Sequence, residues 1–554
     1  MHLPLILELS TALLSILLVF FFRSSNIFFK LPANLSFQVP VNLTSDYGRI
    51  IHGSPAAVLK PSSPDDISLL LKSIYSSPLH NDVTVAARGT GHSTHGQALA
   101  PGGFVIDMRS LPLSITIVDG DGTSYVDAGG GALWIDVLNE TLRHGLSPRS
   151  WTDYLYLTVG GTLSVGGISG QTFKQGPQIS NVVEMDVVTG KGEIVQCSEQ
   201  ENSDLFHGVL GGLGQLGIIT RARIKLRPAP PMVAWIRVKH HDFDQFTRHG
   251  ELVVNSGEVD YLEGFIKFGD APQSHQPKNA FSRFGAERCV KPRQPTAYYL
   301  LEMAIYYDDD DVSDAAKKRA KVLARVSSMT SVEILEVSYL DFLNRVREEE
   351  LSLRRMGLWD VPHPWMNLFV PRSQIRRFHD LFLRTMSDSC VNGPIIMYPT
   401  LRHQWNLNTS IVVPQDEAGE DVFYVVSVLR AAPPTCTVGS SCLDGLMQQN
   451  EQMIRMATAR GSSHGGGGMG AKQYMPYLQC EEEWREHFGQ KWKRFEELKS
   501  KFDPLNVLAP GQRIFKRRKP LKASAEAGEL KSPFLPSKQP SDLTVLLLFL
   551  FGRE

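Results

Sequence analysis

The stretch AARGTGHSTHGQA, residues 86–98, begins in the last two residues of the predicted strand Val83 to Ala87 and holds three glycines. Strand formers followed at once by glycines predict a strand that ends in a tight loop. Bare backbone N–H groups in such a loop can converge on one small volume, which is typical of a site for an anion such as phosphate. We therefore predict an anion-binding loop that contains Arg88, Gly89, Thr90, Gly91 and Ser93.

His92 lies inside this loop, although phosphate binding needs no imidazole. From the residues alone two interpretations stay open. His92 could cap the turn through a hydrogen bond, or it could be a nucleophile held over a cofactor, because imidazole nitrogen forms covalent bonds to electrophilic centres. His95 follows three residues later, but no further ligand cluster is near, so a metal pair is the weaker interpretation and we predict no metal site.

The chain around this loop, from about Gly53 to Pro231, alternates short β-branched runs with helical stretches, which predicts an α/β or α+β domain. Residues 62–77, SSPDDISLLLKSIYSS, read as a helix that Ser63-Pro64 opens. Residues 156–173, YLTVGGTLSVGGISGQTF, are rich in glycine between strand formers. We expect the backbone there to approach another group closely.

A G-x-G-x-x-G pattern occurs at residues 212–217, where it suggests a dinucleotide fingerprint. Strand formers follow it, from Ile218 to Leu226, whereas the fingerprint must open a helix. We interpret it as a turn between the helical segment SDLFHGVL and that strand.

Two carboxylates are candidates for a role in catalysis or substrate binding. Asp153 lies among Trp, Tyr and Leu residues, and burial would raise the pKa of such a carboxyl group and suit it to accepting a proton. An ordinary turn aspartate is the alternative. Glu263, in DYLEGFI, occupies an apolar strand, where an unpaired carboxylate would be costly and needs a partner.

The segment Pro228-Ala-Pro-Pro231 marks a boundary, after which longer strands such as VAWIRVKH and YYLLEMAIYY appear. We assign residues 232–470 to a second domain and expect a flexible loop at His464 to Gly470. Residues 481–504 then predict one amphipathic helix that ends at Asp503-Pro504. The tail, residues 517–554, has no predicted fold.

Six segments resemble the cytokinin dehydrogenases, within the larger family of flavoproteins similar to vanillyl alcohol oxidase. They begin at Gly91 (GHS), Trp151 (WTDYLYLTVGGTLSVGGISGQTFKQGPQISNV), Asn202 (NSDLFHGVLGGLGQLGIITRARI), Asp260 (DYLEGF), His363 (HPWMNLFVP) and Phe502 (FDPLNVLAPGQRIF). The resemblance implies a two-domain fold, in which residues 50–231 and 471–516 build the FAD-binding domain and residues 232–470 form a cap that binds substrate.

The resemblance also implies roles for residues at the cofactor. His92 would carry a covalent bond to the flavin of FAD. The other residues expected at the cofactor are Arg88, Gly89, Thr90, Gly91, Ser93, Gln97, Asp153, Thr158, Ser164, Ile168, Ile219, Tyr474 and Gln512.

The implied reaction is cleavage of the N6 side chain of an isoprenoid adenine, in plant hormone catabolism. Asp153 would accept the proton of the side-chain amine, Glu263 would contact the adenine at the pocket mouth, and Trp405 would line the substrate pocket. Hydride would pass to the flavin, and a quinone-like acceptor or dioxygen would reoxidise it. Two rivals are a related covalent-flavin oxidase acting on an alcohol or carbohydrate, and a membrane-anchored protein that only sequesters cytokinin.

Composition bounds the remaining possibilities. The 554 residues carry a formal net charge of -1, which offers no field for binding nucleic acid, and we expect a monomer. Residues 1–30 include an apolar run from Leu3 to Phe22, which predicts a signal peptide or signal anchor and a secretory, extracellular, vacuolar or ER-lumen location. Sequons at Asn34, Asn42, Asn139 and Asn408 agree with that route. Cys436 and Cys442 could pair there or stay free.

Overall fold

The computed structural model describes residues 35–39, 43–76, 82–120, 122–268, 297–326, 331–386, 392–415, 419–459 and 468–517. The predictions for residues 1–30, for most of the glycine run at 464–470 and for nearly all of the tail fall outside these ranges. In the part of the chain that is described, no helix has the length and apolarity needed to cross a bilayer.

The first sheet positions the loop of residues 89–98. Its strand order is β1 (Phe37–Gln38), β2 (Ala57–Leu59), β4 (Phe104–Asp107) and β3 (Val85–Arg88), and the last three run parallel. Helix α2 (Pro64–Ser76) begins where Ser63-Pro64 predicts and buries Ile67, Leu70, Leu71 and Ile74 in the core of this sheet. The loop leaves the carboxyl end of β3, the edge where ligands bind in open parallel sheets.

The second sheet is antiparallel and follows the order β5 (Ile115–Gly120), β6 (Thr123–Gly129), β10 (Gly217–Pro228), β8 (Val182–Thr189) and β9 (Ile194–Ser198), with β7 (Leu146–Pro148) also on β10. Helices α3 (Trp134–Leu142), α4 (Val159–Leu163) and α5 (Thr172–Gln175) lie in its connections. The G-x-G-x-x-G pattern forms the turn between α6 (Ser203–Val209) and β10, so the prediction of a turn is confirmed.

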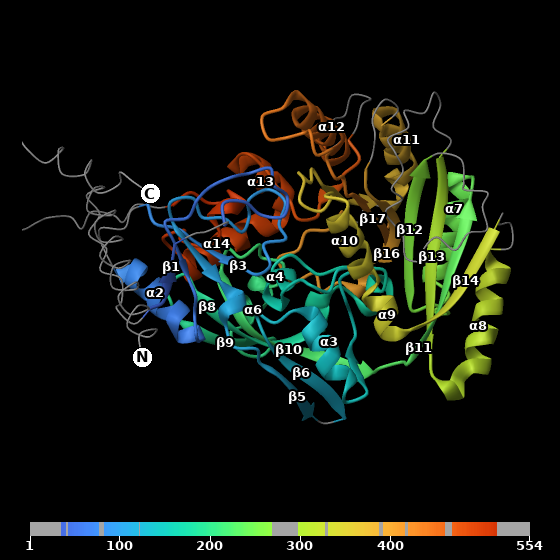
Figure 1. The fold of residues 1–554 in the computed structure, drawn as a ribbon, viewed down its shortest axis with the longest axis horizontal. Helices are drawn as coiled ribbons and strands as arrows, with labels where there is room; N and C mark the ends of the chain where they lie inside the picture. The colour runs from blue at the N-terminus through green and yellow to red at the C-terminus, as the bar shows by residue number, and fades with distance from the viewer. Residues whose placement is uncertain are drawn as a thin grey trace, which may run out of the picture. The chain divides into compact units, whose positions relative to one another are not determined.

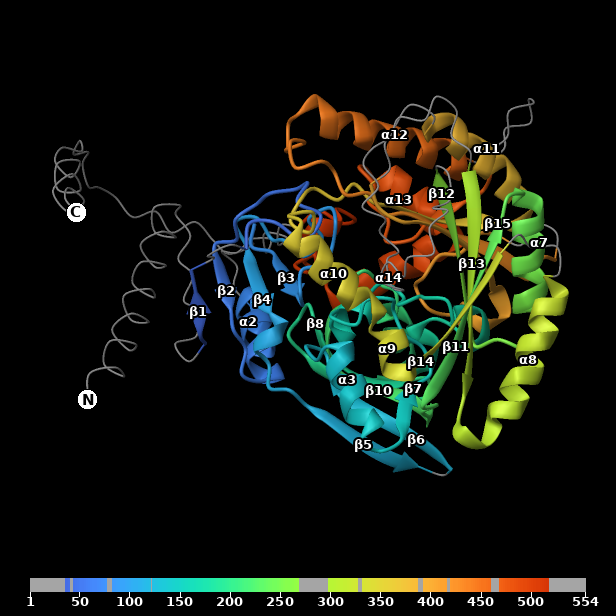
Figure 2. The ribbon, with the colours of Figure 1, turned by 45° about the vertical axis from the view of Figure 1, so that its right-hand side comes forward.

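Among the described residues, the third sheet has eight antiparallel strands. Their order is β14 (Ser331–Ser338), β11 (Met232–His240), β13 (Ala297–Tyr307), β12 (Tyr261–Phe268), β16 (Ile395–Leu401), β17 (Val422–Val428), β15 (Met366–Pro371) and β18 (Lys472–Gln473). Helices α7 (Phe243–Val254), α8 (Val312–Arg325) and α11 (Ile375–Met386) cover one face, as Figures 1 and 2 show. Helices α9 (Tyr339–Leu343) and α10 (Arg345–Arg355) lie on the other side, toward the first two sheets (Figure 2).

The last helices depart from the prediction of one long helix. The segment divides into α13 (Glu481–Phe488) and α14 (Trp492–Phe502), because Gly489 between them has a φ of 54°, which no helix accommodates. Helix α14 does end before Asp503-Pro504, as predicted. Helix α12 (Ser441–Thr458) precedes these two, and the disulfide between Cys436 and Cys442 lies at its start, with Cα atoms 5.5 Å apart.

The C-terminal segment returns to the first sheet. The backbone N–H of Val85 donates to the carbonyl of Val507 at 2.9 Å, and that of Ala509 donates to the carbonyl of Val85 at 2.9 Å. Residues 507–509 therefore lie along β3, at the edge of the first sheet that carries the loop of His92. This arrangement agrees with an FAD-binding domain built from both ends, although the residue boundaries themselves stay predictions.

Candidate functional site

The loop after β3 presents unused donors. The backbone N–H groups of Thr90, Gly91, His92 and Ser93 have no acceptor among the described residues, and Nη1 of Arg88 is buried there without a partner. The loop is held from behind by Asp46, whose Oδ2 accepts from Ser93 Oγ at 2.8 Å and from Gly96 N at 2.6 Å. The loop is thus fixed in place while its donors stay available, which suits an anionic group such as a diphosphate.

His92 lies in an aromatic stack. Its ring stacks on Tyr47 at 3.9 Å between centroids, and Tyr47 stacks in turn on His363 at 4.2 Å. Burial, assisted by His363, lowers the pKa of His92 to about 3. The imidazole is therefore neutral at physiological pH, the form with a nucleophilic lone pair. Neither ring nitrogen bonds a group in the described part of the chain, which disfavours the interpretation of His92 as a turn cap.

The other residues predicted at the cofactor form two groups. In the first, a Cβ on Gly89 would lie 2.2 Å from Oγ1 of Thr158, and one on Gly160 would lie 3.1 Å from the carbonyl oxygen of Ile219. Gln97 and Gln512 join this group, since a Cβ on Gly511 would come within 2.1 Å of the carbonyl oxygen of the residue before Gln97. Segments far apart in sequence thus meet at the loop.

The second group surrounds Tyr474. Its hydroxyl accepts a hydrogen bond from the backbone N–H of Gly167 at 3.3 Å, directly before Ile168. The hydroxyl of Ser164 donates to the carbonyl of Gly160 at 2.7 Å, at the end of helix α4. These contacts bring the predicted residues together without testing their individual roles.

Asp153 is a partly buried carboxylate rather than an ordinary turn residue, with 25% of its side chain exposed. Its Oδ1 accepts from Ser169 Oγ at 2.7 Å, from the Tyr261 hydroxyl at 3.1 Å and from Arg345 Nη2 at 3.0 Å. The sequence prediction considered burial alone. The guanidinium at 3.0 Å adds an opposite effect, because a cation at that distance favours the charged carboxylate.

Glu263 lies two residues after Tyr261 on β12 and therefore on the same face of the strand. It is fully buried, at 0% exposure, and lies opposite Glu302 of β13. The strand register places this carboxylate in the interior of the protein, and its expected place at the pocket mouth stays a prediction. Its contact with substrate stays a prediction.

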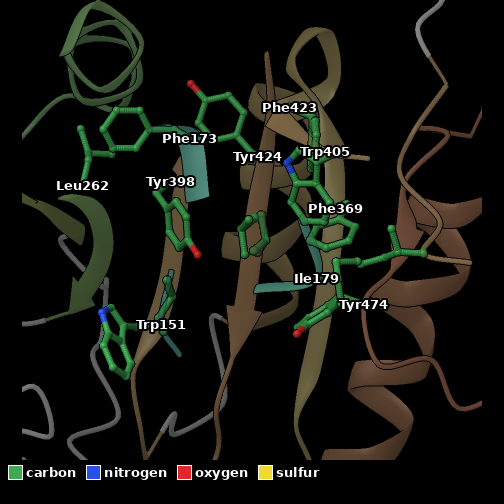
Figure 3. Packing of buried hydrophobic residues seen from close by; sticks show 14 of the residues in the cluster. Trp151, Phe173, Ile179, Leu262, Phe369, Tyr398, Trp405, Phe423, Tyr424 and Tyr474 are labelled. Carbon is green, nitrogen blue, oxygen red and sulfur yellow. The ribbon is translucent and has the colours of Figure 1, made fainter. Parts of the chain in front are cut away.

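Trp405 belongs to an aromatic wall. Figure 3 shows its ring packed with those of Phe369 and Phe423. The ring centroid of Trp405 lies 5.3 Å from that of Phe369 and 5.4 Å from that of Phe423, and Phe369 lies 5.1 Å from Tyr474. Trp405 is 4% exposed, and its indole N–H has no acceptor among the described residues. Such a wall suits an apolar chain, and the predicted role of Trp405 stays a prediction.

The glycine-rich stretch approaches other parts of the protein closely at several positions, and Gly170 is one of them. A Cβ on Gly170 would lie 2.5 Å from Cζ of Tyr261, and the backbone N–H of Leu262 donates to the carbonyl of Gly170 at 2.9 Å. The close approach expected from the sequence is therefore real here, and the partner is strand β12 of the third sheet.

Sequence reasoning missed four residues of this site. Tyr47 carried no motif, and Tyr261 stood unremarked inside the quoted DYLEGF. Arg345 and Glu350 lie in RVREEELSLRR, where buried charges cannot be told from surface charges. Yet Arg345 is 2% exposed, and Glu350 accepts from the hydroxyl of Tyr154 at 2.6 Å.

No described group of three or more His, Cys, Asp or Glu side chains could hold a metal ion. The donor set of the loop fits the diphosphate of a dinucleotide, and the neutral imidazole of His92 beside it fits a covalent attachment. The site therefore has the chemistry that the sequence predicts for FAD.

Comparison with known proteins agrees with this reading. A family model described as "Cytokinin dehydrogenase 1, FAD and cytokinin binding" matches residues 230–515, and a model of an FAD binding domain matches residues 55–198. The chain belongs to the cytokinin dehydrogenase family. Its cofactor is FAD, and its fold is the α+β fold of the flavoproteins related to vanillyl alcohol oxidase.

Two relatives illustrate the match. Cytokinin dehydrogenase 3 of Oryza sativa subsp. japonica is 48% identical over 484 residues, which cover 86% of this chain and 89% of the relative. Cytokinin dehydrogenase 1 of Arabidopsis thaliana is 43% identical over 499 residues, 89% of this chain and 84% of the relative.

Solved structures support the fold alone. A chitooligosaccharide oxidase superposes with a TM-score of 0.58 at 15% identity, over 85% of this chain and 95% of that one. A VAO-type flavoprotein from Myceliophthora thermophila gives the same TM-score and identity over 82% of this chain and 79% of that one.

Proposed function

We propose that this cytokinin dehydrogenase cleaves the N6 side chain of isoprenoid adenines oxidatively, in plant hormone catabolism. The products are adenine and an unsaturated aldehyde. The observation that carries the proposal is the partly buried Asp153 carboxylate, whose Oδ1 accepts from Ser169, Tyr261 and Arg345.

When bound, FAD supplies the two-electron acceptor for a hydride from the carbon next to the side-chain nitrogen. Asp153 accepts the proton of the amine nitrogen, so that the nitrogen lone pair stabilises the positive charge developing on that carbon. The bond formed is the C=N bond of an imine, and water then cleaves it. A positioned base of this kind contributes roughly 10²–10⁴-fold in rate.

The remaining side chains bind and orient. The aromatic wall of Phe369, Trp405 and Phe423 excludes water from the isoprenoid chain. His92 would hold the flavin covalently through a ring nitrogen. Its pKa of about 3 keeps the ring neutral, which leaves a nitrogen lone pair available for that bond. The hydroxyl of Tyr154, whose ring lies 5.1 Å from that of His92, is anchored on buried Glu350.

The test is turnover of N6-isopentenyladenine by the purified protein with a quinone acceptor, combined with the visible spectrum of acid-denatured, washed protein. We expect turnover and retained yellow flavin. Asp153→Asn should keep the flavin and lose about 10²–10⁴-fold in rate, while Asp444→Asn, on the exposed side of α12, should match wild type.

Two outcomes would refute the proposal. Retained flavin without turnover indicates an oxidase of another substrate class, such as an alcohol or carbohydrate. Tight binding of isopentenyladenine, with no turnover and no effect of Asp153→Asn, indicates a protein that sequesters cytokinin.

We further propose that the chain enters the secretory pathway and works as a monomer, with a quinone-like acceptor or dioxygen. Asn139 and Asn408 are exposed, and the Cys436–Cys442 disulfide suits an oxidising compartment. A shift in mass after endoglycosidase treatment of the protein from plant cells supports this location. An unshifted mass together with reduced cysteines contradicts it.

A further inference from the structure

Arg345 is an unusually buried cation at the start of α10. It is 2% exposed, and its side chain reaches from the third sheet's side of the molecule to Asp153 in the connection before α4. Its Nη1 donates to the carbonyl of Phe342 at 2.8 Å, and its guanidinium carbon lies 4.5 Å from the centre of that ring. Taking such a charge out of water is strongly unfavourable unless an opposite charge and hydrogen bonds compensate it. The groups that compensate this buried charge therefore indicate its role.

The guanidinium makes a three-membered cluster with Tyr261 and Asp153. Its Nη2 donates both to the Tyr261 hydroxyl and to Asp153 Oδ1, and the Tyr261 hydroxyl donates to the same Oδ1. The guanidinium also lies over the Tyr261 ring, 4.9 Å from its centre. The two side chains therefore fix both the rotation and the charge of the carboxylate.

We propose that Arg345 is a positioning residue, acting with Tyr261, that holds the Asp153 carboxylate ionised and aimed for proton acceptance. The inference rests on the proposed role of Asp153 as the base. A base is useful only in its deprotonated form and at hydrogen-bond distance from the proton, and a displacement of about 1 Å can cost on the order of 100-fold in rate. Neither Arg345 nor Tyr261 needs to touch the substrate for this effect.

Charged and titratable groups from several elements surround the cluster, among them Arg227, Asp260 and Tyr339, which act on Tyr306. Tyr306 of β13 faces Arg345, and burial raises the pKa of its phenol well above the usual range, so it stays neutral. Glu349 lies one turn along α10 and is buried. Glu350 is held by Arg347 and Arg354. Arg345 pairs directly with Asp153, with Nη2 3.0 Å from Oδ1.

The experiment compares flavin-loaded wild type, Arg345→Met and Arg345→Lys, with Arg355→Met as the matched control on the exposed face of α10. Wild-type turnover of isopentenyladenine is measured first, so that failure of the proposed function is seen independently. In Arg345→Met we expect kcat to fall about 100-fold, with a much smaller change in KM. The acid limb of the pH profile should move to higher pH, because the carboxylate has lost its cation. Arg345→Lys should restore part of kcat and return the limb toward its original position.

A wild-type kcat and an unmoved acid limb in Arg345→Met would overturn the inference, and so would an equal loss in Arg355→Met. Should Arg345→Met fail to fold, Tyr261→Phe decides, because it keeps the ring on Gly170 and removes only the hydroxyl. A kcat reduced with flavin content intact supports the cluster, and an unchanged kcat overturns it.

Discussion

Replacing Gly170 by alanine tests the closest approach between the glycine-rich stretch and strand β12. The new Cβ would lie 2.5 Å from Cζ, 2.6 Å from Cε2 and 2.7 Å from Cε1 of Tyr261. Gly170 has no positive φ, so the alanine itself is not strained. Two effects then oppose each other. Lower entropy of the unfolded chain would stabilise by about 0.4–1 kcal/mol, whereas overpacking a buried ring costs about 1–3 kcal/mol.

Overpacking wins because Tyr261 cannot withdraw. Its ring is fully buried, packs edge-on against Phe342 at 5.1 Å and lies under the guanidinium of Arg345. We expect the free energy of unfolding to fall by about 1–2 kcal/mol. The displaced hydroxyl should also lose its bond to Asp153, and kcat should fall about tenfold or more.

The assay is urea unfolding followed by tryptophan fluorescence, with kcat measured on the same preparations. Gly445→Ala is the control, because nothing lies within 4 Å of its added Cβ in helix α12. It should stabilise by up to about 1 kcal/mol. In a Tyr261→Leu background, Gly170→Ala should cost much less, since the ring tip is gone. Equal midpoints for Gly170→Ala and Gly445→Ala would show that the ring does not lie where the structure places it.

Three further outcomes follow from other contacts. His92→Ala should release the flavin on acid denaturation, while His95→Ala, whose ring stacks on Tyr477, should retain it; a washed spectrum decides. Lys499→Met breaks a buried ion pair of 2.7 Å and should cost about 3–5 kcal/mol, whereas Lys501→Met, 59% exposed, should cost under about 1 kcal/mol in urea unfolding. Burial lowers the pKa of His487 to about 3, so the folded state resists its protonation. The stability it contributes is complete above pH 6.5 and is lost as pH falls toward 3, by at most about 1.4 kcal/mol per pH unit; His487→Gln should flatten that slope in unfolding measured at several pH values.

The sequence predicted those features whose cause is local. A strand followed by glycines predicted the loop of His92, and a proline after serine predicted the start of α2. Long apolar runs predicted the strands β11 and β13. The helix after residue 480 was predicted too long, because amphipathic periodicity continued across Gly489 although its positive φ interrupts the helix. Glu263 was recognised as a carboxylate in a strand, but its depth depends on which strands flank β12, and periodicity carries no such information.

Asp153, the proposed proton acceptor, shows most clearly why other features of the site could not be predicted from the sequence. Asp153 receives one bond from nearby in sequence, from Ser169, and two from residues beyond the boundary at Pro231, namely Tyr261 and Arg345. The local residue sets where the carboxylate lies, whereas the distant pair adds a positive charge that no pattern around WTDY contains. A base assembled in this way exists only when the third sheet is closed on the glycine-rich stretch, through contacts such as that of Tyr261 with Gly170. A change that loosens the contact between Tyr261 and Gly170 should therefore lower kcat even where the flavin is retained.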